Sequence, residues 1–331
     1  MTFRRQSGFS LLETIAALAV LLAVGGIVMS GMVQLMRTQG TIANRTEMHT
    51  SVRSATELLQ QEIGQGGKVS LGDPNASVTL AAAVAAGPNP VAFSLNTSTG
   101  AAPTVYPNEV LTVDLGANQE TVTVATGSSS SGTATFATAH AAGATVTALG
   151  AFSTGIVPPD AHGVNPNCTP NGYTGLSNGS TCNVLKLYGD INGDGNMVYV
   201  EYTCNQGTST SPGILYRNQM PFTAASKPAN DNTMILLNNI LGNPNDANGN
   251  PVPCFNYQIQ PLGTGYVVTN VAVTLTVQTP NKDPQTGVYQ PETKALLNVS
   301  PRNVFEVFDT AKLVDPTRAQ PMPASVSNLL P

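Results

Sequence analysis

The chain contains no tryptophan, and only 10% of its 331 residues are charged. Its three histidines are far apart and its four cysteines form no CxxC pair, so the usual spacing of a zinc site is absent. The formal net charge of −5 gives no general basic surface, which argues against nucleic acid as a partner. With 31 glycines and 24 prolines, the composition favours a loop-rich β domain over a helical enzyme.

Common enzyme motifs are missing as well. Walker and dinucleotide-binding glycine patterns do not occur. The segment Gly175–Gly179 matches the GxSxG string of serine hydrolases, but that motif needs a strand before the serine and a helix after it. Here both flanks are rich in Asn, Gly and Thr, which predicts a turn. His49, His140 and His162 have no acidic or thiol partner within obvious reach, so we expect no enzymatic activity.

What the chain does have is a long apolar run directly after a short basic leader, Met1–Gly8. In the run Phe9–Met36, Glu13 is the only ionisable side chain. Signal peptides place the small residue of the cleavage site after the apolar core, whereas Gly8 precedes it. Cleavage at Gly8 therefore leaves the apolar run on the mature protein. A carboxylate in a membrane-spanning helix costs roughly 2.5–3.5 kcal/mol at mid-membrane, which marks Glu13 as a functional residue.

The segment Gly8-Phe9-Ser10-Leu11-Leu12-Glu13-Thr14 resembles the class III signal of type IV prepilins and type II secretion pseudopilins. An ordinary single-span anchor explains neither the Gly8–Phe9 junction nor the acid. The resemblance implies that a prepilin peptidase cleaves between Gly8 and Phe9 and methylates the new Phe9 amine. It also implies that Glu13 meets the N-terminal amine of a neighbouring subunit, since opposite charges attract strongly at low dielectric and either alone is penalised.

The same resemblance implies a location. Arg4 and Arg5 in the leader favour a cytoplasmic N-terminus by the positive-inside rule. The chain would then be a single-pass protein of the bacterial inner membrane with its head in the periplasm, and later a part of a pilus or pseudopilus.

The order of motifs in the distal half narrows the resemblance to PilW-type minor pilins and the related PulJ-type pseudopilins. In chain order these motifs are Asp190–Gly195, a strand with Tyr199 and Tyr202, Ile214–Arg217, the strand Val271–Val277, a polar loop and Ser300–Asn303. The resemblance implies a minor pilin, a structural subunit that helps to initiate or cap type IV pilus assembly. Its partners would be other pilins, the prepilin peptidase and the inner-membrane assembly platform. The alternatives are a type II secretion pseudopilin and a pilus-displayed adhesin or binding module.

We expect an α+β fold that begins with one long helix. After the leader (1–8), residues 9–33 are apolar all round and long enough to span a bilayer. Residues 34–66 form an amphipathic spine, whose apolar positions recur every three or four residues: Met48, Val52, Ala55, Leu59 and Ile63. The glycine-rich segment Gly64–Gly67 ends the helix. Antiparallel strands packed on the spine would complete the pilin architecture.

Two β regions follow the helix. Residues 70–150 predict a small inserted β module, with strands at Glu109–Asp114, Glu120–Ala125, Thr133–Thr138 and Ala144–Leu149, a turn at Gly116–Asn118 and a linker tract at Ser128–Ser131. Residues 151–331 predict the β-rich head, with strands at Val184–Tyr188, Met197–Thr203, Gly213–Arg217, Cys254–Gln260, Tyr266–Gln278 and Lys294–Val299. In Tyr266–Gln278, strict alternation places Val271, Val273, Leu275 and Val277 on one face.

The four cysteines all lie in the distal half of the chain. An even number in an exported segment suggests two disulfides, for which three pairings are possible. We favour Cys168–Cys182, which closes a short polar loop, and Cys204–Cys254, which joins two strands expected to be adjacent and antiparallel.

Residues 190–201 fit the calcium-loop pattern D-x-[DN]-x-[DN]-G-x5-E in full. The candidate ligands for Ca²⁺ are Asp190, Asn192, Asp194, Asn196 and Glu201, and the sharp turn is made by Gly195. The alternative is a simple hairpin, because both flanks predict strands and the Asn-Gly and Asp-Gly steps favour positive φ. No other cofactor is indicated.

The leader predicts the mature N-terminus. We expect N-methylated Phe9 as the first residue of the membrane-extracted protein, and a bulky residue in place of Gly8 should block processing. Mass spectrometry of the intact protein from a host with an active prepilin peptidase measures the mass of the mature chain and so identifies its N-terminus. An N-terminus still beginning at Met1 in that host would overturn the prepilin assignment.

Overall fold

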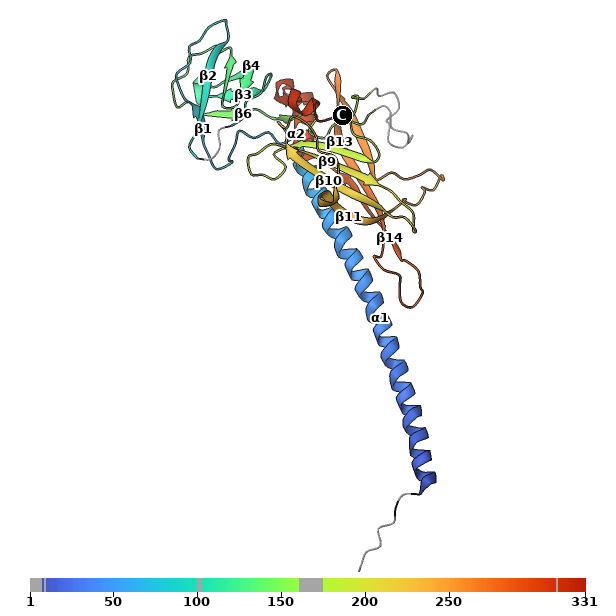
Figure 1. Cartoon of the computed structure of the whole chain (residues 1–331). Coiled ribbons are helices and arrows are strands. Elements are labelled where there is room, and N and C mark those ends of the chain that lie inside the picture. Colours follow the sequence, from blue (N-terminus) through green and yellow to red (C-terminus); the bar gives the residue numbers. More distant parts are fainter. Residues whose placement is uncertain (1–7, 9, 100–102, 161–174, 314) are drawn as a thin grey trace, which may run out of the picture. The chain divides into compact units, whose positions relative to one another are not determined.

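The computed structural model describes residues 8, 10–99, 103–160, 175–313 and 315–331. It has one long N-terminal helix, α1 (Leu11–Gln65), followed by antiparallel β-sheets, which confirms the α+β class (Figure 1). The chain divides into two compact units. The first combines residues 1–50 with the loop at 278–291, and the second contains residues 51–277 and 292–331.

In the first unit, α1 exposes its apolar side chains. Leu11, Leu22 and Ile27 are at least two-thirds exposed, and the helix is long and apolar enough to cross a membrane. A Cβ added at Gly25, Gly26 or Gly31 would meet no atom within 4 Å. These glycines are therefore free to bring another helix close to α1, as small residues do in membranes.

The C-terminal part of α1 is the buried spine that the sequence predicts. All five predicted apolar positions are buried: Met48, Val52, Ala55, Leu59 and Ile63. The helix ends at Gln65, inside the range in which the glycines were expected to stop it, and Gly67 follows with a φ of +83°. The Asn303 side chain donates a hydrogen bond to the Gln65 carbonyl, which would otherwise have no partner within the helix.

The residues of the expected inserted module form a six-stranded antiparallel sheet of order β1-β2-β5-β4-β3-β6. Its strands are β1 (Val78–Leu80), β2 (Val91–Thr97), β3 (Val110–Val113), β4 (Glu120–Ser128), β5 (Ser131–Ala134) and β6 (Val146–Ala148). A bridge between Thr79 and Thr145 brings the two edges of this sheet together. The enclosed core includes Leu80, Phe93, Leu111, Val124 and Phe136.

Four of these strands, β3 to β6, lie where the sequence predicts strands, and Gly116–Asn118 forms a short 3₁₀ turn. The linker expected at Ser128–Ser131 is wrong. Ser128 and Ser131 are paired across the β4–β5 hairpin, with Ser129 at a φ of +48° in the tight turn. In the sequence, a serine tract that forms the turn between two paired strands looks like a flexible linker, because both consist of small polar residues.

The head sheet has the order β12-β13-β11-β10-β9-β8, with β14 paired to β13. Its strands are β8 (Val184–Gly189), β9 (Val198–Asn205), β10 (Gly213–Pro221), β11 (Ile235–Leu241), β12 (Phe255–Leu262), β13 (Gly265–Gln278) and β14 (Pro291–Val299). Every predicted head strand is present, and the predicted apolar face of β13 is buried. Strand β11 and the helix α2 (Arg302–Leu313) were not predicted from the sequence.

The remaining elements are short. A two-stranded parallel pair joins β7 (Ala151–Phe152) to β15 (Ala319–Gln320), and the helix α3 (Ala324–Ser327) lies near the C-terminus. The side chain of Gln320 connects the head to the six-stranded sheet, since it accepts a hydrogen bond from Val110 N and donates to the carbonyls of Val110 and Leu149. Gln320 itself is fully buried.

A buried charged cluster joins α1 to the head sheet. Glu62 is 3% exposed, and its carboxylate accepts hydrogen bonds from the Arg217 guanidinium on β10 and from the Tyr202 hydroxyl on β9. Arg217 Nε lies 3.0 Å from Glu62 Oε1. Burial, followed by the adjacent Glu62 charge, raises the pKa of Tyr202, so its hydroxyl stays a donor.

Arg217→Leu should destabilise the head by about 3 kcal/mol, because it leaves Glu62 buried without a counter-charge. Adding Glu62→Gln should recover much of that loss, since glutamine removes the charge and still accepts from Tyr202. Thermal unfolding of the full chain in detergent, followed by circular dichroism, measures both effects. The control is Arg53→Leu, which removes an exposed pair with Glu57 and should leave the melting temperature nearly unchanged. Equal melting temperatures for the Arg217 and Arg53 variants would contradict the role of the cluster.

Candidate functional site

The candidate processing and assembly residues lie at the start of α1. Gly8 is exposed, and a Cβ built on it would meet no atom of the described residues within 4 Å. Packing against the described residues therefore does not require glycine at this position. Phe9 lies outside the described residues.

Glu13 lies in the first turn of α1, where it forms a reciprocal cap with Ser10. Ser10 N donates to Glu13 Oε2 at 3.0 Å, and Glu13 N donates to Ser10 Oγ at 3.3 Å. This is the capping box, whose S-x-x-E spacing is visible in the sequence. Among the described residues Glu13 has no cationic partner. Within the described part of the chain, its carboxylate thus closes the helix terminus without a counter-charge.

The calcium-loop residues form the connection of a β-hairpin. Strands β8 and β9 pair antiparallel up to Gly189 and Val198, and the loop between them turns at Gly193 and Gly195, whose φ angles are +70° and +86°. A Cβ at Gly195 would lie 1.9 Å from the Gly72 carbonyl oxygen, so only glycine fits there. The hairpin alternative is the arrangement that the structure shows.

The candidate ligands are not brought together in this hairpin. Asp190 is fully buried, with Oδ2 2.9 Å from Lys68 Nζ and Oδ1 accepting from Gly195 N, while the side chains of Asn192, Asp194 and Asn196 are exposed. Glu201 lies within β9, and its carboxylate accepts from the Tyr199 hydroxyl and from Lys227 Nζ, both at 2.8 Å. Within the described ranges no group of three or more His, Cys, Asp or Glu is placed to hold a metal ion.

The two acids at the ends of the calcium pattern are each already paired with a lysine. The donor set as arranged does not fit Ca²⁺, and calcium binding stays a prediction from the sequence.

The cysteine pairing Cys204–Cys254 is confirmed. The expectation that this disulfide joins two adjacent strands is wrong, because β9 and β12 are not neighbours in the sheet. Instead the sheet curls until its edges meet: Phe255 N donates to the Cys182 carbonyl, and the Tyr257 hydroxyl donates to the carbonyls of Thr181 and Val184. Cys182 is also disulfide-bonded. Cys168, its predicted partner, lies outside the described residues.

The expectation that His140 has no acidic partner is wrong. His140 is buried in the six-stranded sheet, with Nδ1 3.1 Å from Asp114 Oδ2 and Nε2 2.6 Å from Glu120 Oε1. Both ring nitrogens face carboxylates, so the arrangement favours the doubly protonated imidazolium. Burial lowers the pKa of His140, but the hydrogen bonds and charges of Glu120 and Asp114 outweigh it and raise the pKa above 6.5.

The other sequence candidates have simple structural roles. The Gly175–Gly179 segment is a turn, as predicted: Gly179 N donates to the Leu176 carbonyl, and Asn178 has a φ of +62°. His49 is exposed on α1, and His162 lies outside the described residues. Comparison of the chain with protein-family models, curated proteins and solved structures found no match, so the function is inferred from the residues themselves.

The His140 contacts predict a pH-dependent stability. A raised histidine pKa stabilises the fold fully below the ordinary value of 6.5, and this stabilisation is lost as the pH rises through the folded pKa. The hydrogen bonds from His140 lower the pKa of Asp114 and, against the opposing effect of burial, help to lower that of Glu120. The stability that these two carboxylates contribute is therefore lost only as the pH falls through their lowered pKa values.

The variant His140→Leu should therefore be most destabilised, relative to the parent, between pH 4.5 and 6.5. The measurement is the difference in melting temperature between the two proteins across the pH range. Taking the difference cancels the effect of Glu109, whose pKa burial raises to about 8. A difference that does not change with pH would mean that His140 acts only by packing against Phe136, whose ring centroid is 5.8 Å away.

Proposed function

We propose that the chain is a minor pilin, a structural subunit that helps to initiate or cap a type IV pilus. The observation that carries this proposal is the start of α1. There, an exposed glycine that the fold does not need precedes a helix of bilayer length, and the helix carries one acid in its first turn. Neither a soluble core helix nor a plain anchor calls for that combination.

Under this proposal, cleavage by a prepilin peptidase comes first, and the pairing of charges between subunits follows. Cleavage after Gly8 makes Phe9 the new N-terminal residue, four positions before Glu13. In the membrane a carboxylate and an amine from two neighbouring subunits then neutralise each other, and this fixes the axial register of one subunit against the next. The buried spine of α1 carries the head.

A type II secretion pseudopilin is the first alternative, since it would use the same membrane helix and the same acid, Glu13. A binding module displayed on a pilus is the alternative from another class. The observation that favours it is the six-stranded sheet, which encloses a hydrophobic core of its own within residues 71–146. Binding of the whole protein to host-cell or glycan surfaces would support that second function.

The Glu13 hypothesis has a sharp test, because the capping role and the charge role can be separated. Glu13→Ala removes both the cap, worth about 1 kcal/mol, and the charge. Glu13→Gln removes the charge only, since glutamine also serves in a capping box. We expect both variants to insert in the membrane with an unchanged head melting temperature, and both to fail to co-purify with partner pilins after cross-linking. Co-purification of the Gln variant at the level of the parent would show that the charge is not needed.

A further inference from the structure

The loop that connects β13 to β14 is folded around one buried carboxylate. Asp283 is only 4% exposed, and its Oδ1 accepts hydrogen bonds from the backbone N–H groups of Gln285 at 2.6 Å and Thr286 at 3.1 Å. Its Oδ2 accepts from the Gln290 side chain. The tip of the loop is thus held in a defined shape by its own acid.

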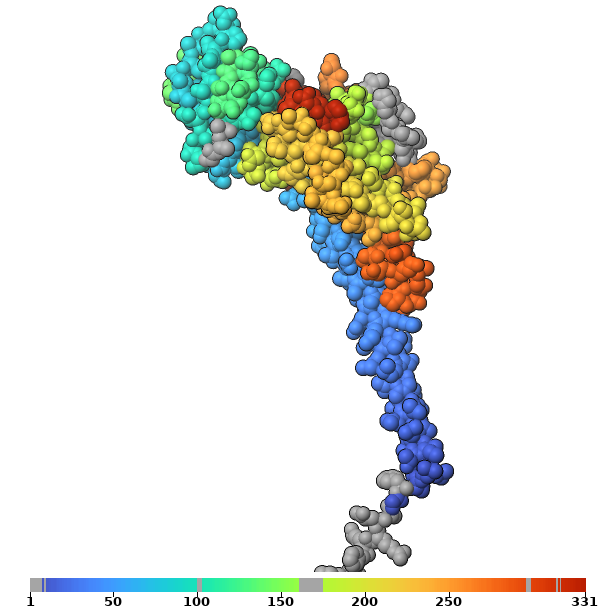
Figure 2. All heavy atoms as spheres, in the orientation of Figure 1, coloured from blue at the N-terminus to red at the C-terminus, as the bar shows by residue number. Residues whose placement is uncertain are grey.

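The loop is also attached to one side of α1, within the same unit (Figure 2). Thr41 Oγ1 donates to Asp283 Oδ1 at 3.2 Å, and Gln285 Nε2 donates to Thr38 Oγ1 at 3.1 Å. Helix residue Gly40 leaves room for the loop, since a Cβ there would lie 3.0 Å from Pro284 Cγ. The loop therefore follows the helix toward its N-terminus.

The tip of the loop reaches the point on α1 at which the apolar run ends. The run that begins after the leader continues to Met36, and Arg37 is the first charged residue beyond Glu13. A groove lies between this part of the helix and the tip, and its lining passes from apolar to polar and basic: Met29, Ser30, Val33, Gln34, Arg37 and Gln285. If the run spans the bilayer, this groove lies where hydrocarbon gives way to headgroups.

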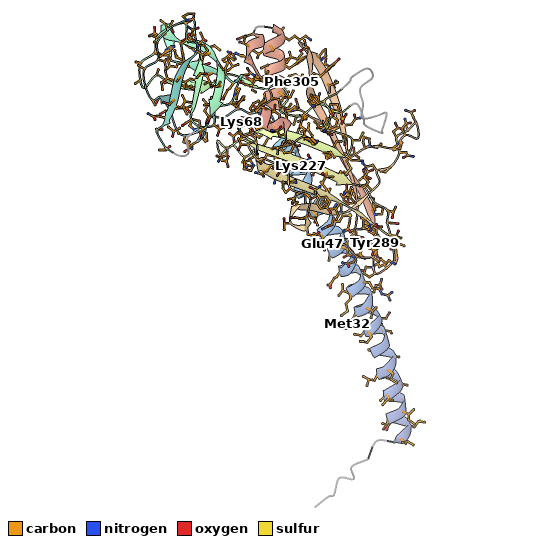
Figure 3. All side chains as sticks on the ribbon, turned by 45° about the horizontal axis from the view of Figure 1, so that its top comes forward. Met32, Glu47, Lys68, Lys227, Tyr289 and Phe305 are labelled. Carbon is orange, nitrogen blue, oxygen red and sulfur yellow. A yellow bond between two sulfur atoms is a disulfide. The ribbon has the colours of Figure 1, made fainter. Side chains whose placement is uncertain are left out.

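Arg37 is the charged residue in the groove lining. It is exposed, whereas Asp283 is buried and its carboxylate accepts four hydrogen bonds. The helix carries no acid between Glu13 and Glu47. Lys282 lies outside the lining: its Nζ is 5.8 Å from the centre of the Tyr289 ring, and Tyr289 lies near Glu47 (Figure 3).

We propose that this groove docks an anionic phospholipid, with the lipid phosphate against Arg37 and the first part of an acyl chain against Met29 and Val33. The inference rests on the membrane-spanning part of the proposed function and does not depend on which filament the chain joins. The occupant is a lipid because the groove is continuous with an apolar helix surface of bilayer length and because its polar end is cationic. Each cation near an anionic surface contributes about 1 kcal/mol, or roughly fivefold in affinity.

The test uses the full chain in detergent, titrated with phosphatidylglycerol or with phosphatidylcholine, and native mass spectrometry counts the retained lipid. We expect selective retention of phosphatidylglycerol. The variant Arg37→Gln should weaken it about fivefold. Asp283→Ala keeps Arg37 but frees the loop tip, and it should reduce the selectivity as well. Arg53→Gln, which removes an exposed cation from the same helix away from the groove, is the matched control.

Four results would overturn the proposal: equal retention of the two lipids, an equal loss in Arg37→Gln and in Arg53→Gln, displacement of the lipid by inorganic phosphate at the same concentration, or retention of no lipid. Retention of no lipid together with loss of partner pilins from Arg37→Gln would assign the groove to a neighbouring subunit. Alkaline extraction confirms that each variant is still membrane-integrated. Failure of the Glu13 variants to behave as expected would leave lipid retention unchanged, so the two proposals fail separately.

Discussion

The head depends on one constraint, which is that the last turns of α1 bury a charged residue together with their apolar face. Ala55, Leu59 and Ile63 are fully buried or nearly so, and Glu62 is buried beside them. Apolar contacts tolerate some sliding and rotation of a helix on a sheet, but a buried carboxylate does not. Any rotation that separated Glu62 from Arg217 and Tyr202 would leave a charge in the core without compensation. The cluster thus fixes the position of the helix against β9 and β10, two strands in the middle of the sheet.

Much of this fold could be predicted from the sequence because its strongest signals are local. Helical spacing predicted the buried face of α1, and alternation predicted the buried face of β13. Among the elements that were not predicted, two have identifiable reasons. Strand β11 has the sequence ILLNNIL, in which Asn239 has a φ of +62° and interrupts the alternation. Helix α2 follows a Ser-Pro pair, and its buried residues Val304, Val307 and Phe308 show helical spacing that was hidden by many polar neighbours.

The candidate sites were predicted less well, because their chemistry is non-local. His140 meets Asp114 and Glu120, which lie 26 and 20 positions away and come together only when β3, β4 and the following loop pack. The side chains of the calcium pattern lie apart in the described residues for a related reason. Twelve-residue spacing matches a calcium loop only if the chain coils around the ion, and here the second half of the pattern is an extended strand that carries Glu201 to Lys227. The disulfide Cys204–Cys254 required the curl of the sheet, which no local pattern encodes.

The two acids near the ends of α1 make the strongest argument about function. Glu62 has an arginine and a tyrosine hydroxyl from its own head, so its charge is balanced within one chain. Glu13 is embedded in a run without another ionisable residue, and within the described part of the chain its carboxylate contacts only the Ser10 backbone of its own helix end. A helix cap is satisfied equally well by a neutral glutamine, whereas an acid in an apolar segment is penalised for its charge. Under the proposed function, the terminal amine of a neighbouring subunit at the same depth in the membrane would offset the cost of the Glu13 charge with no change to the fold.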